Sequence, residues 1–310
     1  MFSVLQTEAV PDADVPSSED TIERAKVAQV ENLSDLALVQ QCDVILSVVP
    51  PRYATSTAQR IIDALSGGTL EGKSPLYYAD LNAVSPSTCR KISALFGKSR
   101  ASVRFIDGCI LGGPPALKTA PDAGSNVSEA PDADAEWSRP SLPVCGPHKL
   151  SDIAGFGPRL FETLNMRHIA GDIGAASGLK MCFASASKGL TAIGVQSFTT
   201  AARLSVLTEL QEEMRARLPD HYRILERGVV TMPPKAYRWV REMEEISQTH
   251  EEDGGFGPFL FKGAAGVYKA VADDSVLGLE KIGKRKRGLT VEDVAAAMAE
   301  GLERKKKKTD

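Results

Sequence analysis

The chain has 310 residues, 43% of them hydrophobic and 25% charged, which is enough for two globular domains with ordinary cores. Its formal net charge of −3 argues against a protein-wide nucleic-acid or membrane surface, and no apolar run is long enough to cross a membrane. The 5 cysteines and 4 histidines show no metal-ligand spacing, and the acidic start is not a signal peptide. We therefore predict no metal site and a cytoplasmic protein.

Strands and helices alternate over the first half of the chain. Ser34 has the N-cap pattern of a short helix, and the β-branched run that follows Asp43 and ends in prolines is typical of a strand buried on both faces. The sequence predicts strands at about residues 2–5, 43–49, 76–80, 102–107 and 142–145, and helices at about residues 19–27, 35–41, 54–65 and 86–96. This alternation indicates a doubly wound α/β domain over residues 1–172.

The second half of the chain has a helical period, and an irregular segment precedes it. Residues 118–140 are rich in Pro, Ala, Asp, Ser and Gly, so we expect a mobile surface insertion with Trp137 as its one aromatic residue. Helices are predicted at about residues 201–218, 222–228, 236–252, 259–272 and 291–302, and the basic run 304–308 is expected to fray. The sequence thus predicts an all-helical second domain over residues 173–310.

Two lysines lie near the start of the helix that joins the predicted domains. Small residues from Gly174 to Gly178 precede Lys180, and apolar residues recur at helical spacing as far as about Arg203. At about 100° per residue, Lys180 and Lys188 are roughly 80° apart on one side of this helix. One interpretation is that they line a cleft, where an amine that loses solvation is suited to proton transfer. The other is that both extend into solvent from a connecting helix.

The run Gly-Ala-Ala-Ser-Gly-Leu-Lys that ends at Lys180 resembles the glycine-rich segment with a catalytic lysine in β-hydroxyacid dehydrogenases, the superfamily of 6-phosphogluconate and 3-hydroxyisobutyrate dehydrogenases. Extended to Gly189, it is closer to the 6-phosphogluconate dehydrogenase-like proteins that have their own helical C-terminal domain. The resemblance implies an NAD(P)-dependent oxidoreductase that acts on a small hydroxy acid. In this reaction Lys180 accepts the hydroxyl proton, and Lys188 assists or holds an anionic group. Ala184 stands where better known members have an asparagine.

The resemblance also implies cofactor contacts. Val49, Pro50 and Pro51 match the positions beside the nicotinamide half of NAD or NADP, and Asn82 matches the polar position of the segment D-x-[SN]-T-x-x-P. Without the resemblance, the first of these segments is simply a buried strand that ends at prolines. The sequence has no G-x-G-x-x-G turn after a strand, so we expect a truncated Rossmann-type domain in which Met1 falls near the family's second strand. Two explanations fit this pattern: the gene model is incomplete, or the protein has lost the segment that binds the pyrophosphate of the cofactor.

The predicted substrate contacts also come from the resemblance. Gly112 and Gly113 match the glycines of the superfamily's substrate loop, D-x-P-V-S-G-G, and Leu111 replaces the serine that donates to the substrate. Their amides, together with Lys188, are the predicted donors to a small anionic hydroxy acid. The absent phosphate-binding turn and the changes at Leu111 and Ala184 support an alternative function, a non-catalytic homologue that serves as a dimerisation or binding module.

The expected partners follow from the helical domain and from the charge pattern. We expect a homodimer formed through the helical domain and no membrane contact. The basic run 281–288 fits a nuclear-import or nucleic-acid patch, a solvated charged segment, or an anion clamp for substrate. One short basic cluster in an acidic protein is weak support for polynucleotide binding, so no nucleic-acid partner is expected.

Overall fold

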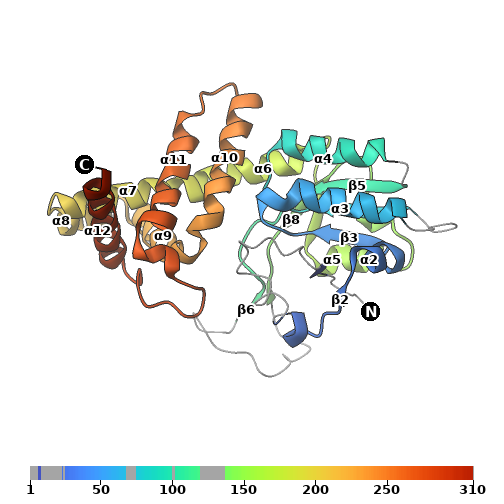
Figure 1. The fold of residues 1–310 in the computed structure, drawn as a ribbon, viewed down its shortest axis with the longest axis horizontal. Coiled ribbons are helices and arrows are strands. Elements are labelled where there is room, and N and C mark those ends of the chain that lie inside the picture. The colour runs from blue at the N-terminus through green and yellow to red at the C-terminus, as the bar shows by residue number, and fades with distance from the viewer. Residues whose placement is uncertain are drawn as a thin grey trace. The chain divides into compact units, whose positions relative to one another are not determined.

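The structure is a computed structural model that describes residues 6–7, 23, 25–67, 75–99, 102–118 and 137–309. The described residues form two compact units, and Figure 1 shows their elements. The first unit contains the described residues up to 82, together with 86–110 and 141–177, and the second contains 83–85, those of 111–140, and the chain from 178 onwards. The division into domains at residues 172 and 173 stays a prediction.

The first unit is built on a five-stranded sheet. In sheet order the strands are β3 (Val44–Ser47), β4 (Leu76–Asp80), β5 (Val103–Gly108), β8 (Leu142–Cys145) and β9 (Met166–His168). The first three are parallel, β8 is antiparallel to β5, and β9 is parallel to β8. The α/β class and the predicted strands from 43–49 onwards are confirmed. β9 is an unpredicted strand because Arg167 and His168 are exposed and interrupt any apolar run.

Helices connect the strands of this sheet. α2 (Asp35–Gln41) begins after Ser34, whose Oγ accepts a hydrogen bond from the Ala37 N–H at 3.2 Å, so the predicted cap is confirmed. The helices α3 (Ala54–Gly67) and α4 (Pro86–Lys98) follow β3 and β4 as predicted, and α5 (Gly157–Thr163) precedes β9. Buried side chains from the strands, such as Ile106 and Val144, pack against Leu150 in the core of this unit.

The N-terminal elements are short in the described part of the chain. β1 (Gln6–Thr7) pairs in parallel with β2 (Asn32–Leu33), separately from the main sheet. The strand predicted at residues 2–5 and much of the helix predicted at 19–27 lie outside the described residues.

The second unit is helical. Its long helices are α7 (Leu190–Arg203), α8 (Leu207–Arg217), α9 (Pro219–Thr231), α10 (Ala236–Glu252), α11 (Phe259–Lys269) and α12 (Val291–Thr309). Its core includes Met243, Ile246 and Val271. The helix predicted over 201–218 is interrupted at Ser205, whose φ of +59° is outside the helical range. The basic run 304–308 continues α12, so the prediction that it frays is wrong.

A small hairpin stands at the edges of the predicted insertion. β6 (Ala116–Leu117) pairs antiparallel with β7 (Trp137–Ser138), which belongs to the segment predicted to be mobile. Residues 119–136, most of that segment, lie outside the described residues. Among the helices that are described, none combines the length and apolar character needed to cross a membrane.

Candidate functional site

The helix that carries both lysines contains a π-helical turn. α6 (Ala175–Ala184) leads into π-helical residues 185–189 and then into α7, so the predicted long helix is confirmed but not regular. A π turn leaves carbonyls displaced from the usual ladder, and serine hydroxyls can satisfy them. Ser185 Oγ donates to the Met181 carbonyl at 2.8 Å, and Ser187 Oγ donates to the Phe183 carbonyl at 3.0 Å. The serine-rich sequence therefore suits this turn.

The π-helical turn also changes the relative direction of the two lysines. Its hydrogen bonds span five residues rather than four, so each residue advances the helix by less than about 100°. The offset of roughly 80° predicted between Lys180 and Lys188 for a regular helix therefore becomes smaller. Both side chains are half-buried, Lys180 in α6 beside the buried Met181 and Lys188 in the turn itself.

Lys188 is held by side chains of α10. Its Nζ forms an ion pair with Glu242 Oε2 and lies 5.0 Å from the ring centroid of Trp239. The Tyr268 hydroxyl donates to the Lys188 backbone carbonyl, which fixes the turn on a second side. Burial lowers the pKa of Lys188, and the Glu242 carboxylate opposes that shift. These contacts exclude the interpretation in which Lys188 extends fully into solvent. They stabilise a charged ammonium, which is less suited to accepting a proton than a neutral amine.

His250 joins the same turn. Its Nε2 is 2.7 Å from Ser185 Oγ, and its ring stacks on Phe261 with centroids 4.9 Å apart. Because the Ser185 hydroxyl proton is directed to the Met181 carbonyl, the His250 Nε2–H is the donor in this contact. No local pattern in the sequence links residues 185 and 250, so this contact could not be predicted from it.

The predicted cofactor residues lie together at the carboxyl end of β3 and β4. The Val49 N–H donates to Asn82 Oδ1 at 2.6 Å, and Asn82 Nδ2 donates to Ser47 Oγ at 2.9 Å. Asn82 and Pro51 are buried, whereas Pro50 is exposed. Asn82 therefore shapes the loop that follows β3, and its amide is already used by the protein.

This loop gives a partial fit to a nicotinamide cofactor. Val48 is 60% exposed and stands with Pro50 at the end of a parallel strand, where open α/β sheets bind ligands. Together they offer an apolar surface that fits a flat ring. The given sequence contains no G-x-G-x-x-G turn of the kind that holds a pyrophosphate.

The N-terminus of α6 is occupied by the protein's own carboxylate. Asp107, at the end of β5, accepts hydrogen bonds from the N–H groups of Gly174 at 2.8 Å and Ala176 at 3.0 Å, and from Ser177 Oγ at 2.6 Å. A Cβ on Gly174 would lie 2.8 Å from Arg90 Nη1. The small residues before Lys180 thus allow other parts of the chain to pack closely against the start of this helix.

Asp80 precedes the loop that contains Asn82. It is buried, its Oδ1 accepts from the Asn82 N–H at 2.9 Å, and its Oδ2 has no hydrogen-bond partner in the described structure. Burial is the main cause that raises the pKa of Asp80 to about 7, and the nearby Asp107 charge contributes. This carboxyl is therefore a proton-binding group near neutral pH.

The predicted substrate glycines belong to the second unit. Gly112 has a φ of +121°, and a Cβ there would lie 3.3 Å from Pro140 Cα, so this position favours glycine. Gly113 faces open space, and both glycines are exposed. Their placement relative to Val49 and Asn82, which are in the first unit, stays a prediction.

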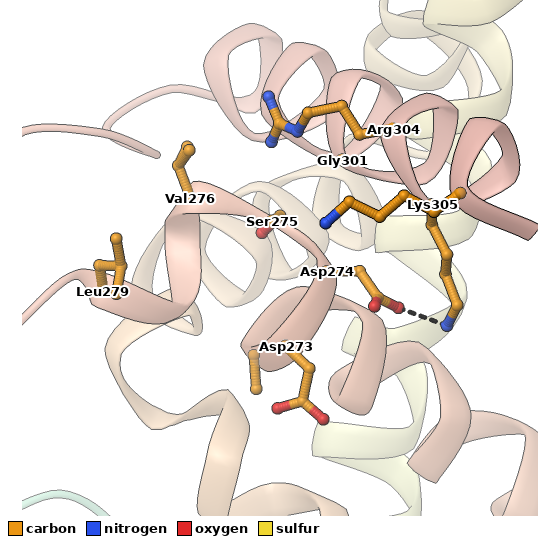
Figure 2. A pocket seen from close by; sticks show the side chains of 10 residues that line it. Asp273, Asp274, Ser275, Val276, Leu279, Gly301, Arg304 and Lys305 are labelled. Carbon is orange, nitrogen blue, oxygen red and sulfur yellow. Dashed lines mark hydrogen bonds and ion pairs between the residues drawn. The ribbon is translucent and has the colours of Figure 1, made fainter.

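A separate surface pocket of about 360 Å³ lies between α12 and the chain that follows α11 (Figure 2). Lys305 and Asp274 form an ion pair across it at 2.7 Å, and Asp273 is paired with Lys269 at 2.5 Å. Its acidic groups are thus neutralised by lysines. Among the described residues no cluster of His, Cys, Asp or Glu is arranged to hold a metal ion.

A family comparison identifies part of the helical unit. Residues 201–271 match the family model described as Domain of unknown function (DUF1932). The DUF1932 segment runs from the end of α7 to the π-helical turn after α11, and it contains the Trp239 and Glu242 contacts of Lys188. No curated protein matches the chain.

Solved structures share the fold of most of the chain. A conserved hypothetical protein from Sinorhizobium meliloti is 20% identical, with a TM-score of 0.56 over 96% of this chain and 88% of that one. The 3-hydroxyisobutyrate dehydrogenase of Mycobacterium tuberculosis, solved with L-serine, is 15% identical, with a TM-score of 0.53 over 89% and 87%. That of Salmonella typhimurium is 16% identical, with a TM-score of 0.53 over 92% and 89%. The likeness confirms the predicted hydroxyacid dehydrogenase fold.

Proposed function

We propose that this chain is an NAD(P)-dependent oxidoreductase that acts on a small hydroxy acid, with Lys180 as its catalytic residue. The observation that supports this most is the fold shared with 3-hydroxyisobutyrate dehydrogenases, in which a sheet unit is followed by a helical unit. Lys180 stands on α6, the helix that follows the sheet unit, and it is half-buried. Fold alone does not define chemistry, so the proposal depends on this residue.

The proposed reaction assigns one role to each group. A nicotinamide cofactor supplies a hydride acceptor when bound beside Val48 and Pro50. The Lys180 amine accepts the hydroxyl proton as the carbinol C–H and O–H bonds break, so the alcohol becomes a carbonyl and the amine becomes an ammonium. The exposed amides of Gly112 and Gly113 donate to the substrate carboxylate. Lys188, already paired with Glu242, contributes positive charge rather than proton transfer.

Turnover of the Lys180 variant tests this proposal. Reduction of NAD⁺ and NADP⁺ is measured with 3-hydroxyisobutyrate and L-serine, the two compounds named for the mycobacterial structure. We expect Lys180→Ala to lower kcat by about 100-fold or more, the range typical of a lost general base, with cofactor affinity within a few-fold. Lys262→Ala, at an exposed lysine of α11, is the matched control. An unchanged kcat in Lys180→Ala overturns the assignment.

Exposed apolar side chains favour a second candidate, association through the helical unit. The loop between α10 and α11 and the start of α11 expose Phe256 (68%), Phe259 (84%) and Leu260 (64%). Contiguous apolar surface of this kind commonly marks a protein interface. The predicted homodimer is tested by light scattering, with Phe259→Asp expected to give monomers of unchanged circular dichroism. A wild-type monomer would exclude the dimerisation module.

A further inference from the structure

The surface pocket beside α12 has no role in the proposed reaction, and residues of the helical unit alone form it (Figure 2). One wall is the chain from 272 to 279, which includes the 3₁₀ helix Val276–Leu279, and the other is the end of α12. Its volume of about 360 Å³ is within the range of ligand pockets, roughly 300–1,000 Å³. The pocket is therefore large enough for a small organic molecule.

A glycine allows the two walls to meet. A Cβ on Gly301 would lie 2.3 Å from the Asp274 carbonyl oxygen and 3.0 Å from Ser275 Cα, so α12 touches the chain that precedes the 3₁₀ helix. The Ser275 hydroxyl donates to the Val271 carbonyl at 2.8 Å and accepts from the Leu277 N–H at 3.2 Å. The junction of the walls is thus fixed by packing, and its serine hydroxyl is already used by the protein.

Positive charge is in excess at this pocket. Its two carboxylates, Asp273 and Asp274, are each paired with a lysine. Within the described residues, Arg304 and Lys308 line the pocket and take part in no ion pair or hydrogen bond. Arg304 forms no ion pair even with Glu300, which precedes it by one helical turn. Two uncompensated cations are therefore left at the end of α12, where they attract an anion.

The opposite wall presents apolar side chains. Leu279 is 82% exposed and Val276 is half-buried, and both line the pocket. Figure 2 shows the Arg304 side chain extending from α12 in the direction of Val276, so a cationic group and apolar groups border the same space. Such a combination fits a ligand that has both an apolar body and an anionic end.

We propose that this pocket binds an aliphatic carboxylate, with the carboxylate group beside Arg304 and Lys308 and the chain against Val276 and Leu279. An arginine fork donates two parallel hydrogen bonds to a carboxylate, and contact with the chain removes the apolar side chains from water. A small inorganic anion would neutralise the cations but would leave Leu279 exposed. The inference does not rest on the proposed oxidoreductase function, because no residue of the pocket takes part in that reaction.

Calorimetric titration of the full chain with octanoate tests the site. We expect saturable binding with a Kd on the order of 1 mM or tighter, which is ordinary for a ligand of this size. Acetate lacks the chain and n-octanol lacks the charge, so each should bind at least about tenfold more weakly. Wild-type protein that does not bind octanoate overturns the proposal, as does equal binding of acetate or n-octanol.

Variants at exposed side chains separate the two walls with little risk to folding. Arg304→Gln should weaken octanoate binding at least about tenfold, whereas Arg238→Gln, at an exposed arginine of α10 that is also without an ion pair, should not. Leu279→Ser should weaken binding several-fold, whereas Leu204→Ser changes a leucine that is 68% exposed outside the pocket. Equal binding by all four variants overturns the proposal.

Thermal unfolding gives a second readout of the same site. Octanoate that binds the folded chain should raise Tm for the wild type and for Arg238→Gln, but not for Arg304→Gln. A Tm that octanoate lowers in all three proteins would contradict the proposal, because octanoate would then bind the unfolded chain. Cosedimentation with phosphatidylserine vesicles that Arg304→Gln abolishes, without octanoate binding, would assign the cations to a membrane surface and also overturns it.

Discussion

Burial determines how the charged side chains around the π-helical turn should be interpreted. The side chains of Lys188 and Glu242 are 21% and 8% exposed, so each has lost much of its hydration and depends on the other. A variant that removes only Lys188 leaves the Glu242 carboxylate without its cation, which is unfavourable in a low dielectric. Loss of activity in a Lys188 variant therefore does not by itself identify a catalytic role. A catalytic role is indicated only if a double variant that also carries Glu242→Gln folds normally and still shows no turnover.

The buried Asp80 carboxyl makes stability depend on pH. Burial raises the folded-state pKa of Asp80 from 3.8 to about 7, so the folded protein holds the carboxyl proton more tightly than the unfolded chain does. The stability that comes from this bound proton is lost as pH rises through 7. Asp80→Asn is neutral at every pH. We expect it to be more stable than the wild type at pH 8, by on the order of 3–4 kcal/mol, and nearly equal to it near pH 4. Urea unfolding across this range measures the difference.

Asp107 provides the control for this experiment. Its carboxylate accepts from backbone N–H groups and from Ser177 Oγ, so Asp107→Asn should destabilise the protein on both sides of neutrality. A stability difference for Asp80→Asn that is the same at pH 4 and pH 8 would show that the Asp80 carboxyl keeps an ordinary pKa.

At the scale of elements, the sequence predicts what depends on local periodicity. α10 was predictable within its observed bounds because a long apolar stripe defines it, and β4 because it is an apolar run. The π-helical turn was not, because it has the same apolar spacing as an α-helix. The break at Ser205 likewise lacks a glycine or proline signal. Lys180 and Lys188 were found from a local motif, whereas Glu242 reaches Lys188 only by tertiary packing.

The π-helical turn depends on a close approach at Gly189. A Cβ there would lie 3.0 Å from Phe261 Cε1, and Phe261 stacks on His250. We expect Gly189→Ala to destabilise the protein by about 1–2 kcal/mol, because overpacking outweighs the gain in helix propensity. Gly263→Ala in α11 makes the same change where nothing lies within 4 Å, and it should stabilise by about 0.5–1 kcal/mol. Chemical denaturation measures the free energy of unfolding of both variants. Equal effects would show that the Phe261 ring moves aside without cost.

At the scale of the whole molecule, the small net charge hides an uneven distribution. The chain carries a formal charge of −3, yet Arg227, Lys235 and Arg238 make no ion pair in the described structure. The basic residues at the end of α12 differ, since Lys305 pairs with Asp274 and Lys307 with Glu303. The net charge therefore argues against a surface that binds polyanions over the whole protein, but it does not argue against a local site for an anion.

Because each of the two units has a core of its own, we predict that the molecule unfolds in more than one step. Ile106 is fully buried in the core of the sheet unit, and Met243 is fully buried in the core of the helical unit. Replacing either by alanine leaves a cavity that costs about 2–5 kcal/mol, and the loss is confined to the unit whose core is damaged. We expect calorimetry to resolve two transitions, with Ile106→Ala lowering the Tm of one and Met243→Ala lowering the Tm of the other. A single transition that both variants shift alike would show that the units unfold as one.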